Sequence, residues 1–182
     1  MWIFIIIIAA IVVIGIVIYN SLIKSRNRVE EAWADIEVQL KRRYDLIPNL
    51  VNTVKGFAAQ ESGVLERVTE ARTRAMGAQN IQEKQQDENM LSGTLKSLFA
   101  VAENYPDLKS NVNFLQLQTD LTDTEDKIQA ARRFYNGNVR DFNTKIEVFP
   151  TNIFASMLGF TKKLFFDIED NGPESQPVEV KF

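Results

Sequence analysis

The side chains able to carry chemistry in this 182-residue sequence are mainly carboxylates, lysines and arginines, because the chain contains no His and no Cys. Their absence excludes thiol nucleophiles, disulfides, imidazole acid–base chemistry and the usual zinc ligands. A carboxylate or lysine enzyme would lack the side chain that enzymes most often use as a general base. We therefore expect no catalysis, no cofactor, no metal and no small-molecule substrate.

Two groups of acidic residues are the candidates for binding a hard cation, for which carboxylate oxygens are the preferred ligands. The groups consist of Glu30, Glu31, Asp35 and Glu37, and of Asp123, Glu125 and Asp126. Their spacing distributes each group around a helix, and the Glu-x-x-His pattern of di-iron sites needs a His. We interpret these residues as a solvated face.

A polar cluster surrounds Pro48. Its members are Arg42, Arg43, Asp45 and Asn49. A proline inside a helix removes a backbone hydrogen bond, so the sequence predicts a helix break near Tyr44, with Asp45 capping the next helix. The cluster would then satisfy freed backbone groups and pair with Glu103 or Asp107. Recognition of a partner protein is the alternative.

The N-terminal segment carries no charged side chain before Lys24 and is long enough, as a helix, to cross a bilayer. From Trp2 to Tyr19 it is almost entirely Ile, Val, Ala and Phe, and its terminal aromatic residues would lie at the two membrane interfaces. A cleaved secretory signal is the alternative, but no Lys or Arg precedes the segment and no small-x-small site follows it. We predict an uncleaved transmembrane anchor over residues 1–23.

Three basic residues follow this anchor directly: Lys24, Arg26 and Arg28. By the positive-inside rule they place the C-terminal domain in the cytoplasm of a single-pass protein of the cell membrane. The chain has 21 basic and 24 acidic residues, and without these three cations the acidic excess grows further. Such a domain is not typical of nucleic-acid binding.

The rest of the chain shows the apolar periodicity of amphipathic helices. An apolar stripe begins with Trp33, Leu40 and Ile47 and ends near Gly77. We expect helices over 24–44 and 46–77, a Gln/Asn-rich loop over 79–89, a third helix over 91–102 and a turn over 104–107. Ser110 or Asn111 would cap the next helix.

A heptad spacing marks that last long helix. Six residues are spaced seven apart: Phe114, Leu121, Ile128, Tyr135, Phe142 and Phe149. Such a seam indicates either a coiled-coil oligomer or a face turned to the protein's own core, and a short multi-helix domain favours the core. Thr124 and Asn138 interrupt the second position of the seam and would set its register.

An aromatic, weakly basic segment follows Pro150. Its candidate interface residues are Phe154, Met157, Phe160, Lys162, Lys163, Phe165 and Phe166. A final helix closing the open end of the bundle is slightly favoured. The alternative is a membrane interface, with the two lysines against anionic headgroups, and both contacts can coexist.

The last residues, 167–182, form an acidic stretch with few packing residues, for which we predict a flexible tail. Val180 and Phe182 alternate with charged residues before the free carboxylate. An extended peptide of this kind is a candidate ligand for the sheet edge of a partner protein.

Several long runs resemble the LemA family. They are residues 26–43 (RNRVEEAWADIEVQLKRR), 45–51 (DLIPNLV), 102–108 (AENYPDL), 130–136 (AARRFYN), Phe149-Pro150 and Gly159-Phe160. The resemblance covers roughly residues 19–166. It implies a bacterial protein with a membrane span followed by a four-helix up-and-down bundle, and it implies no enzymatic activity or cofactor.

Together these observations predict an all-α fold, with an N-terminal transmembrane helix followed by an antiparallel four-helix bundle with long helices. The predicted domains are the anchor (1–23), a LemA-like helical bundle (24–166) and the tail (167–182). We expect a self-associating membrane scaffold or interaction protein that contacts the lipid bilayer, its own copies or another membrane-associated protein. The alternative is an accessory or regulatory subunit of another membrane complex, such as a protease or an envelope-maintenance system.

Overall fold

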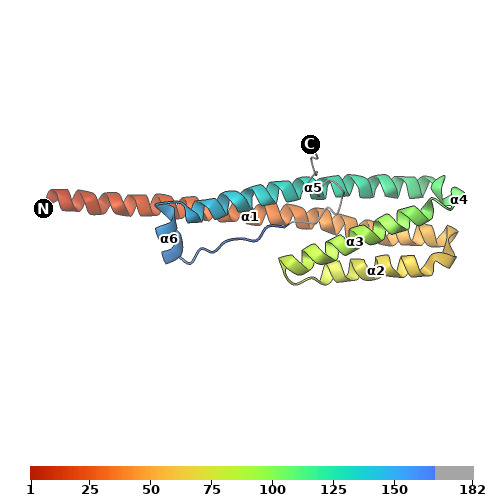
Figure 1. Ribbon diagram of the computed structural model, residues 1–182. Helices are drawn as coiled ribbons and strands as arrows, with labels where there is room; N and C mark the ends of the chain where they lie inside the picture. The colour runs from red at the N-terminus through yellow and green to blue at the C-terminus, as the bar shows by residue number, and fades with distance from the viewer. Residues whose placement is uncertain (167–182) are drawn as a thin grey trace, which may run out of the picture. The chain divides into compact units, whose positions relative to one another are not determined.

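A computed structural model describes residues 1–166, and every regular element in that part of the chain is helical, which confirms the all-α prediction (Figure 1). The elements are α1 (Trp2–Phe57), the 3-10 turn η1 (Ala59–Glu61), α2 (Ser62–Gly77), α3 (Ile81–Ala102), α4 (Pro106–Lys109), α5 (Val112–Glu147) and α6 (Thr151–Met157). Two compact units share them. Unit 1 holds Met1–Arg43 and Thr122–Phe165, and unit 2 holds Tyr44–Leu121 with Phe166. The antiparallel four-helix bundle stays a prediction.

The predicted helix break near Tyr44 is wrong, because α1 continues through Pro48 without interruption. Pro48 has no backbone N–H, so the carbonyl of Tyr44, one turn earlier, loses its helical donor. Arg72 of α2 replaces that donor: its Nε donates a hydrogen bond to the Tyr44 carbonyl oxygen at 2.7 Å. The side chain of another helix thus satisfies the group that would otherwise favour a break.

The chain reverses after Phe57, inside the stretch for which one helix over 46–77 was predicted. This turn is held by Tyr105. Its hydroxyl donates to Glu61 Oε1 at 2.9 Å and accepts a bond from Gln60 Nε2 at 2.9 Å. The bond to the Glu61 carboxylate is the main cause that raises the pKa of Tyr105. The apolar stripe runs through the turn, so its period alone did not indicate the reversal.

The predicted loop over 79–89 is also wrong, because α3 begins at Ile81. Asn80 caps the helix by accepting a bond from the Glu83 N–H at 2.9 Å, and the Glu83 carboxylate accepts one from the Gln79 N–H at 2.9 Å. This exchange resembles a capping box. Residues 91, 95 and 98 of α3 are buried leucines, and α2 and α3 form a helical hairpin in unit 2 (Figure 1).

The long helix α5 confirms the predicted core face. Asn111 caps it, accepting a hydrogen bond from the Phe114 N–H at 3.0 Å. The first five heptad residues, from Phe114 to Phe142, are buried within the chain. The sixth, Phe149, is 80% exposed and lies beyond the end of α5 at Glu147, so its placement in the seam was wrong. A proline disfavours helical geometry at the residue before it, so Pro150 accounts for the end of α5 before Phe149.

Candidate membrane interface

Among the described residues, α1 is the one helix that is long and apolar enough to cross a membrane. Its most apolar window lies near the N-terminus and has a mean hydropathy of 3.2. None of that window is buried inside the protein. The aromatic residues Trp2 and Tyr19 are exposed at its two ends. Leu22 is the first residue of α1 that is fully buried.

The predicted basic residues lie directly after the anchor. Lys24 and Arg28 are exposed. Arg26 lies near the carboxylate of Glu30, with 3.8 Å between Nε and Oε1, and its guanidinium is 5.8 Å from the ring centre of Phe160. One of the three predicted anchor cations is thus also a contact of the C-terminal segment.

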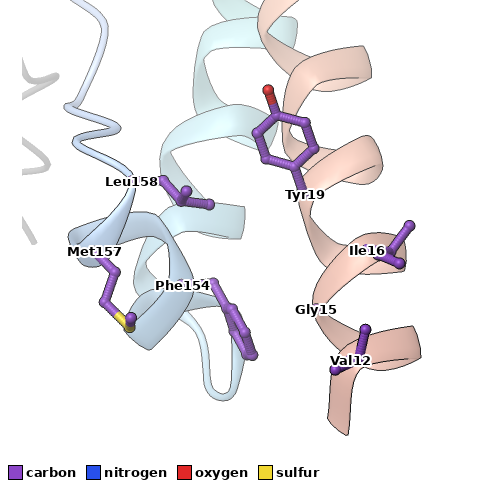
Figure 2. Close-up of a pocket in the computed structure, with 7 residues that line it drawn as sticks. All are labelled: Val12, Gly15, Ile16, Tyr19, Phe154, Met157 and Leu158. Atoms are coloured by element: carbon purple, nitrogen blue, oxygen red, sulfur yellow. The ribbon is translucent and has the colours of Figure 1, made fainter. Parts of the chain in front are cut away.

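The helix α6 packs beside the anchor (Figures 1 and 2). A groove of about 360 Å³ lies between the two, and Figure 2 shows the residues that line it. It is lined by Val12, Gly15, Ile16 and Tyr19 of α1 and by Phe154, Met157 and Leu158. A Cβ atom on Gly15 would lie 3.4 Å from the ring of Phe154, already at contact distance. The small glycine therefore lets the aromatic ring approach the backbone of the anchor closely.

The predicted final helix after Pro150 is present as α6, but it is short, because only Thr151–Met157 of the aromatic segment is helical. Gly159, with φ of 71°, ends α6 in a left-handed conformation that favours glycine. The Phe160 N–H bonds to the Ala155 carbonyl at 3.0 Å and the Gly159 N–H to the Ser156 carbonyl at 3.3 Å. These two bonds form a Schellman motif. After it the chain runs back as an extended segment, residues 160–166.

Two α5 side chains hold this returning segment to unit 1. Asn143 accepts a bond from the Lys163 N–H at 2.8 Å and donates one to the Lys163 carbonyl at 2.9 Å. Tyr135 donates its hydroxyl hydrogen to the Leu164 carbonyl at 2.9 Å. Burial raises the pKa of Tyr135, which keeps this hydroxyl protonated as a donor.

The other members of the predicted interface have mixed positions. Phe160 packs edge-on against Phe142, with ring centres 6.3 Å apart. Lys162 forms an ion pair with Glu147, and Lys163 lies 3.9 Å from a Glu30 carboxylate oxygen. Phe165 is half exposed and Phe166 fully buried. Lysine contacts with lipid headgroups stay a prediction.

The members of the predicted cluster around Pro48 differ in burial. Arg42, Asp45 and Asn49 are exposed. Arg43 is buried, and its Nη1 lies 2.6 Å from Glu125 Oε2, a partner that was not predicted from the sequence.

Sequence reasoning missed the buried charged residues Arg43, Glu88 and Arg132, and for Arg43 and Glu88 the periodicity contained the signal. Arg43 occupies the seven-residue series of Val29, Ile36 and Leu50, all of which are buried. Glu88 lies three residues before Leu91, the first of the buried leucines of α3, and therefore on the same face of the helix. It accepts a hydrogen bond from the Tyr44 hydroxyl. Ionic groups at core positions of helices are used to fix register, which is the role these contacts can serve here.

The acidic groups proposed as a solvated face do not come together as a cation site: no three acidic residues within residues 1–166 could jointly hold a metal ion. The proposed tail ligand, Val180 and Phe182, lies outside the described residues.

Comparison with known proteins agrees with the resemblance seen in the sequence. The model of the LemA family matches residues 32–182. Protein LemA of Metamycoplasma hominis is 28% identical over 83% of this chain and 69% of its own length. Magnetosome protein MamQ 2 of Paramagnetospirillum magneticum is 25% identical over 85% of this chain and 66% of its own length. Magnetosome protein MamQ of Magnetospirillum gryphiswaldense is 24% identical over 81% of this chain and 64% of its own length. The chain thus spans about two thirds of the length of these relatives.

Proposed function

This chain belongs to the LemA family, and we propose that it is a membrane-anchored helical scaffold that associates with itself and with other proteins and catalyses no reaction. The observation that carries the proposal is the continuity of α1 from the apolar segment into the core of unit 1. The anchor reaches Tyr19, and the buried residues Leu22, Val29 and Ile36 follow on the same helix.

Such a junction transmits orientation, because a continuous helix bends far less than a linker. From Ile23 to Arg43 the rise of an α-helix gives a rod of about 30 Å. A scaffold of this construction presents its surfaces at a fixed distance from the bilayer, which a protein tethered by a flexible linker cannot do.

The charged groups in the interior support a structural role. Arg43 pairs with Glu125, and Tyr44 donates to Glu88, so these buried polar groups bind one another. Tyr105 and Tyr135, whose pKa values are raised, act as hydrogen-bond donors to a turn and to the returning segment. Each of these contacts contributes to the fold.

Self-association would need a surface outside the heptad seam, since the seam is buried within one chain. The two long helices of unit 1 each leave a large apolar side chain in solvent, Val38 at 62% and Phe134 at 57% exposure. We propose these two positions as the leading contacts between copies.

The test is the mass of the full-length protein after gentle solubilisation in detergent, with identification of any protein that travels with it. A homogeneous oligomer that dissociates on Val38→Glu or Phe134→Glu, but not on the matched control Arg133→Glu, supports the scaffold. A monomer bound to one stoichiometric second protein contradicts self-association and favours the accessory-subunit alternative.

We propose further that the part of the chain after the anchor faces the cytoplasm, because Lys24, Arg26 and Arg28 flank the anchor on that side. Ser110 is exposed and the chain has no cysteine, so Ser110→Cys creates a single labelling site. A membrane-impermeant maleimide should label it in inverted vesicles and not in intact cells. Labelling in intact cells would reverse the orientation.

A further inference from the structure

The stretch between Glu147 and Lys162 is unusual in composition. Residues 148–161 carry no charged side chain, while the two residues that bound the stretch form an ion pair. The chain therefore leaves α5 at Glu147 and comes back to the same place at Lys162. In between, large apolar side chains face outward: Val148, Phe149, Ile153, Met157 and Leu158 are all exposed, and Met157 is 79% exposed. A soluble surface rarely concentrates so many apolar groups without a covering partner.

The position of this stretch along the anchor gives its depth. Phe154 meets Gly15, which lies one helical turn before Tyr19 (Figure 2). At 1.5 Å per residue this places the contact about 6 Å inside the level of Tyr19, and about 13 Å before the first charged residue, Lys24. Helices that lie in a membrane interface bury their apolar face by about 5–10 Å. The depth of α6 therefore matches that of an interfacial helix.

The polar groups of the stretch are also suited to that depth. The backbone of α6 is closed at its C-terminal end by the Schellman bonds to Ala155 and Ser156. The polar side chains Asn152 and Ser156 are exposed on the same short helix. They are tolerated where water and headgroups reach, but they would be costly at the centre of the bilayer.

We propose that residues 148–161 form a second membrane-embedded element, a loop inserted beside the anchor into the leaflet that faces the soluble units. Its occupant is bilayer lipid, because the groove and the exposed apolar side chains continue the surface of a helix that itself lies in lipid. The Glu147–Lys162 ion pair marks the point where the loop emerges into the headgroup region. Two points of attachment would fix the rotation of unit 1 about the anchor axis.

This inference rests on the proposed membrane anchoring, but it does not depend on self-association. It is tested with single cysteines in the full chain, which has no native cysteine. Met157→Cys probes the loop, Ile11→Cys the anchor and Ala130→Cys an exposed position on α5. The helical rise puts Ala130 about 26 Å from Glu147. Each variant carries an environment-sensitive fluorophore and is reconstituted into vesicles of phosphatidylcholine and phosphatidylglycerol containing spin-labelled lipid.

The expected result is blue-shifted emission and several-fold quenching by spin-labelled lipid at Met157→Cys and Ile11→Cys, with neither effect at Ala130→Cys. At Met157→Cys a spin label near the headgroup should quench more than one near the chain end, since the loop is shallow. Met157 makes little contact inside the chain, so its replacement should leave the helical circular-dichroism spectrum unchanged.

Four results would overturn the inference. Emission at Met157→Cys like that at Ala130→Cys would place the loop in water. A blue shift without lipid quenching would mean that a second copy or another protein covers it. Quenching at Ile11→Cys alone would refute the loop while leaving the anchor intact, whereas loss of quenching at both positions would refute the anchor itself.

Discussion

At the scale of single residues, Pro48 shows how one side chain from elsewhere in the fold can preserve a helix. Arg72 donates to the Tyr44 carbonyl that the proline leaves without its helical donor. Replacing Arg72 with Met should remove this bond and cost about 1–3 kcal/mol in the free energy of unfolding, because the carbonyl is then left unsatisfied. Urea unfolding in detergent micelles, followed by circular dichroism, measures the loss.

A double-mutant cycle identifies the cause. Pro48→Ala restores a backbone N–H that can bond to Tyr44, so Arg72→Met should cost less in that background. Arg74→Met is the matched control on α2, since Arg74 is half exposed in its pairing with Asp87 and surface pairs contribute about 0–1 kcal/mol. Equal costs for Arg72→Met with and without Pro48 would show that the carbonyl is not the reason.

Asn143 is the second residue whose chemistry is specific, because its amide both accepts from and donates to the Lys163 backbone. A carboxylate of the same size accepts but cannot donate, and it repels the Lys163 carbonyl. Asn143→Asp should therefore cost about 1–3 kcal/mol and release the returning segment. Limited proteolysis near residues 158–166 should become faster.

Asn138→Asp is the control for that change, since Asn138 on the same helix bonds only to the carbonyl of Phe134 one turn earlier. It should leave the rate of proteolysis close to that of the parent. Equal protection of residues 158–166 in both variants would mean that Asn143 does not hold the segment.

At the scale of elements, the features predicted from the sequence are those that depend on neighbouring residues. The heptad from Phe114 to Phe142 predicted both the helix α5 and its buried face, because helical periodicity repeats within a few turns. The Asn111 cap was predictable for the same reason, since it acts three residues away.

The features that could not be predicted depend on distant partners. The continuation of α1 through Pro48 needs Arg72, and the reversal after Phe57 needs Tyr105. For the aromatic segment after Pro150 the sequence predicted a final helix or a membrane interface, but its placement follows from the contact between Phe154 and Gly15. No local pattern indicates that a residue far along the chain will meet the anchor at its one glycine.

The buried face of α5 gives the prediction for this scale. Ile128 is fully buried in the middle of the heptad, and Ile128→Asp would place an unpaired charge there. We expect a loss of roughly 4 kcal/mol or more, enough to unfold a marginal unit. Ala130→Asp, an exposed neighbour on the same helix, should change stability by less than about 0.5 kcal/mol. Similar unfolding midpoints for the two variants would show that the seam faces solvent.

At the scale of the whole molecule, the proposed membrane attachment would have two components, which truncation can separate. Removing residues 1–20 deletes the proposed transmembrane segment but keeps Leu22, the first fully buried residue of α1. The fragment should remain helical, because the contacts of Asn143 and Tyr135 that hold the returning segment are unaffected. It would lose the Phe154 contact with Gly15 and the groove that Phe154, Met157 and Leu158 form with α1.

If residues 148–161 insert into lipid, this fragment should still bind vesicles that contain phosphatidylglycerol. Replacing both Ile153 and Met157 with Ser should then weaken binding roughly tenfold or more, since burying each side chain in lipid contributes about 1–3 kcal/mol. Val38→Ser with Phe134→Ser removes comparable exposed apolar surface from the long helices and should leave co-sedimentation with vesicles unchanged. Equal losses in both pairs would mean that the fragment adheres through general hydrophobicity, and membrane attachment would then reside in the anchor alone.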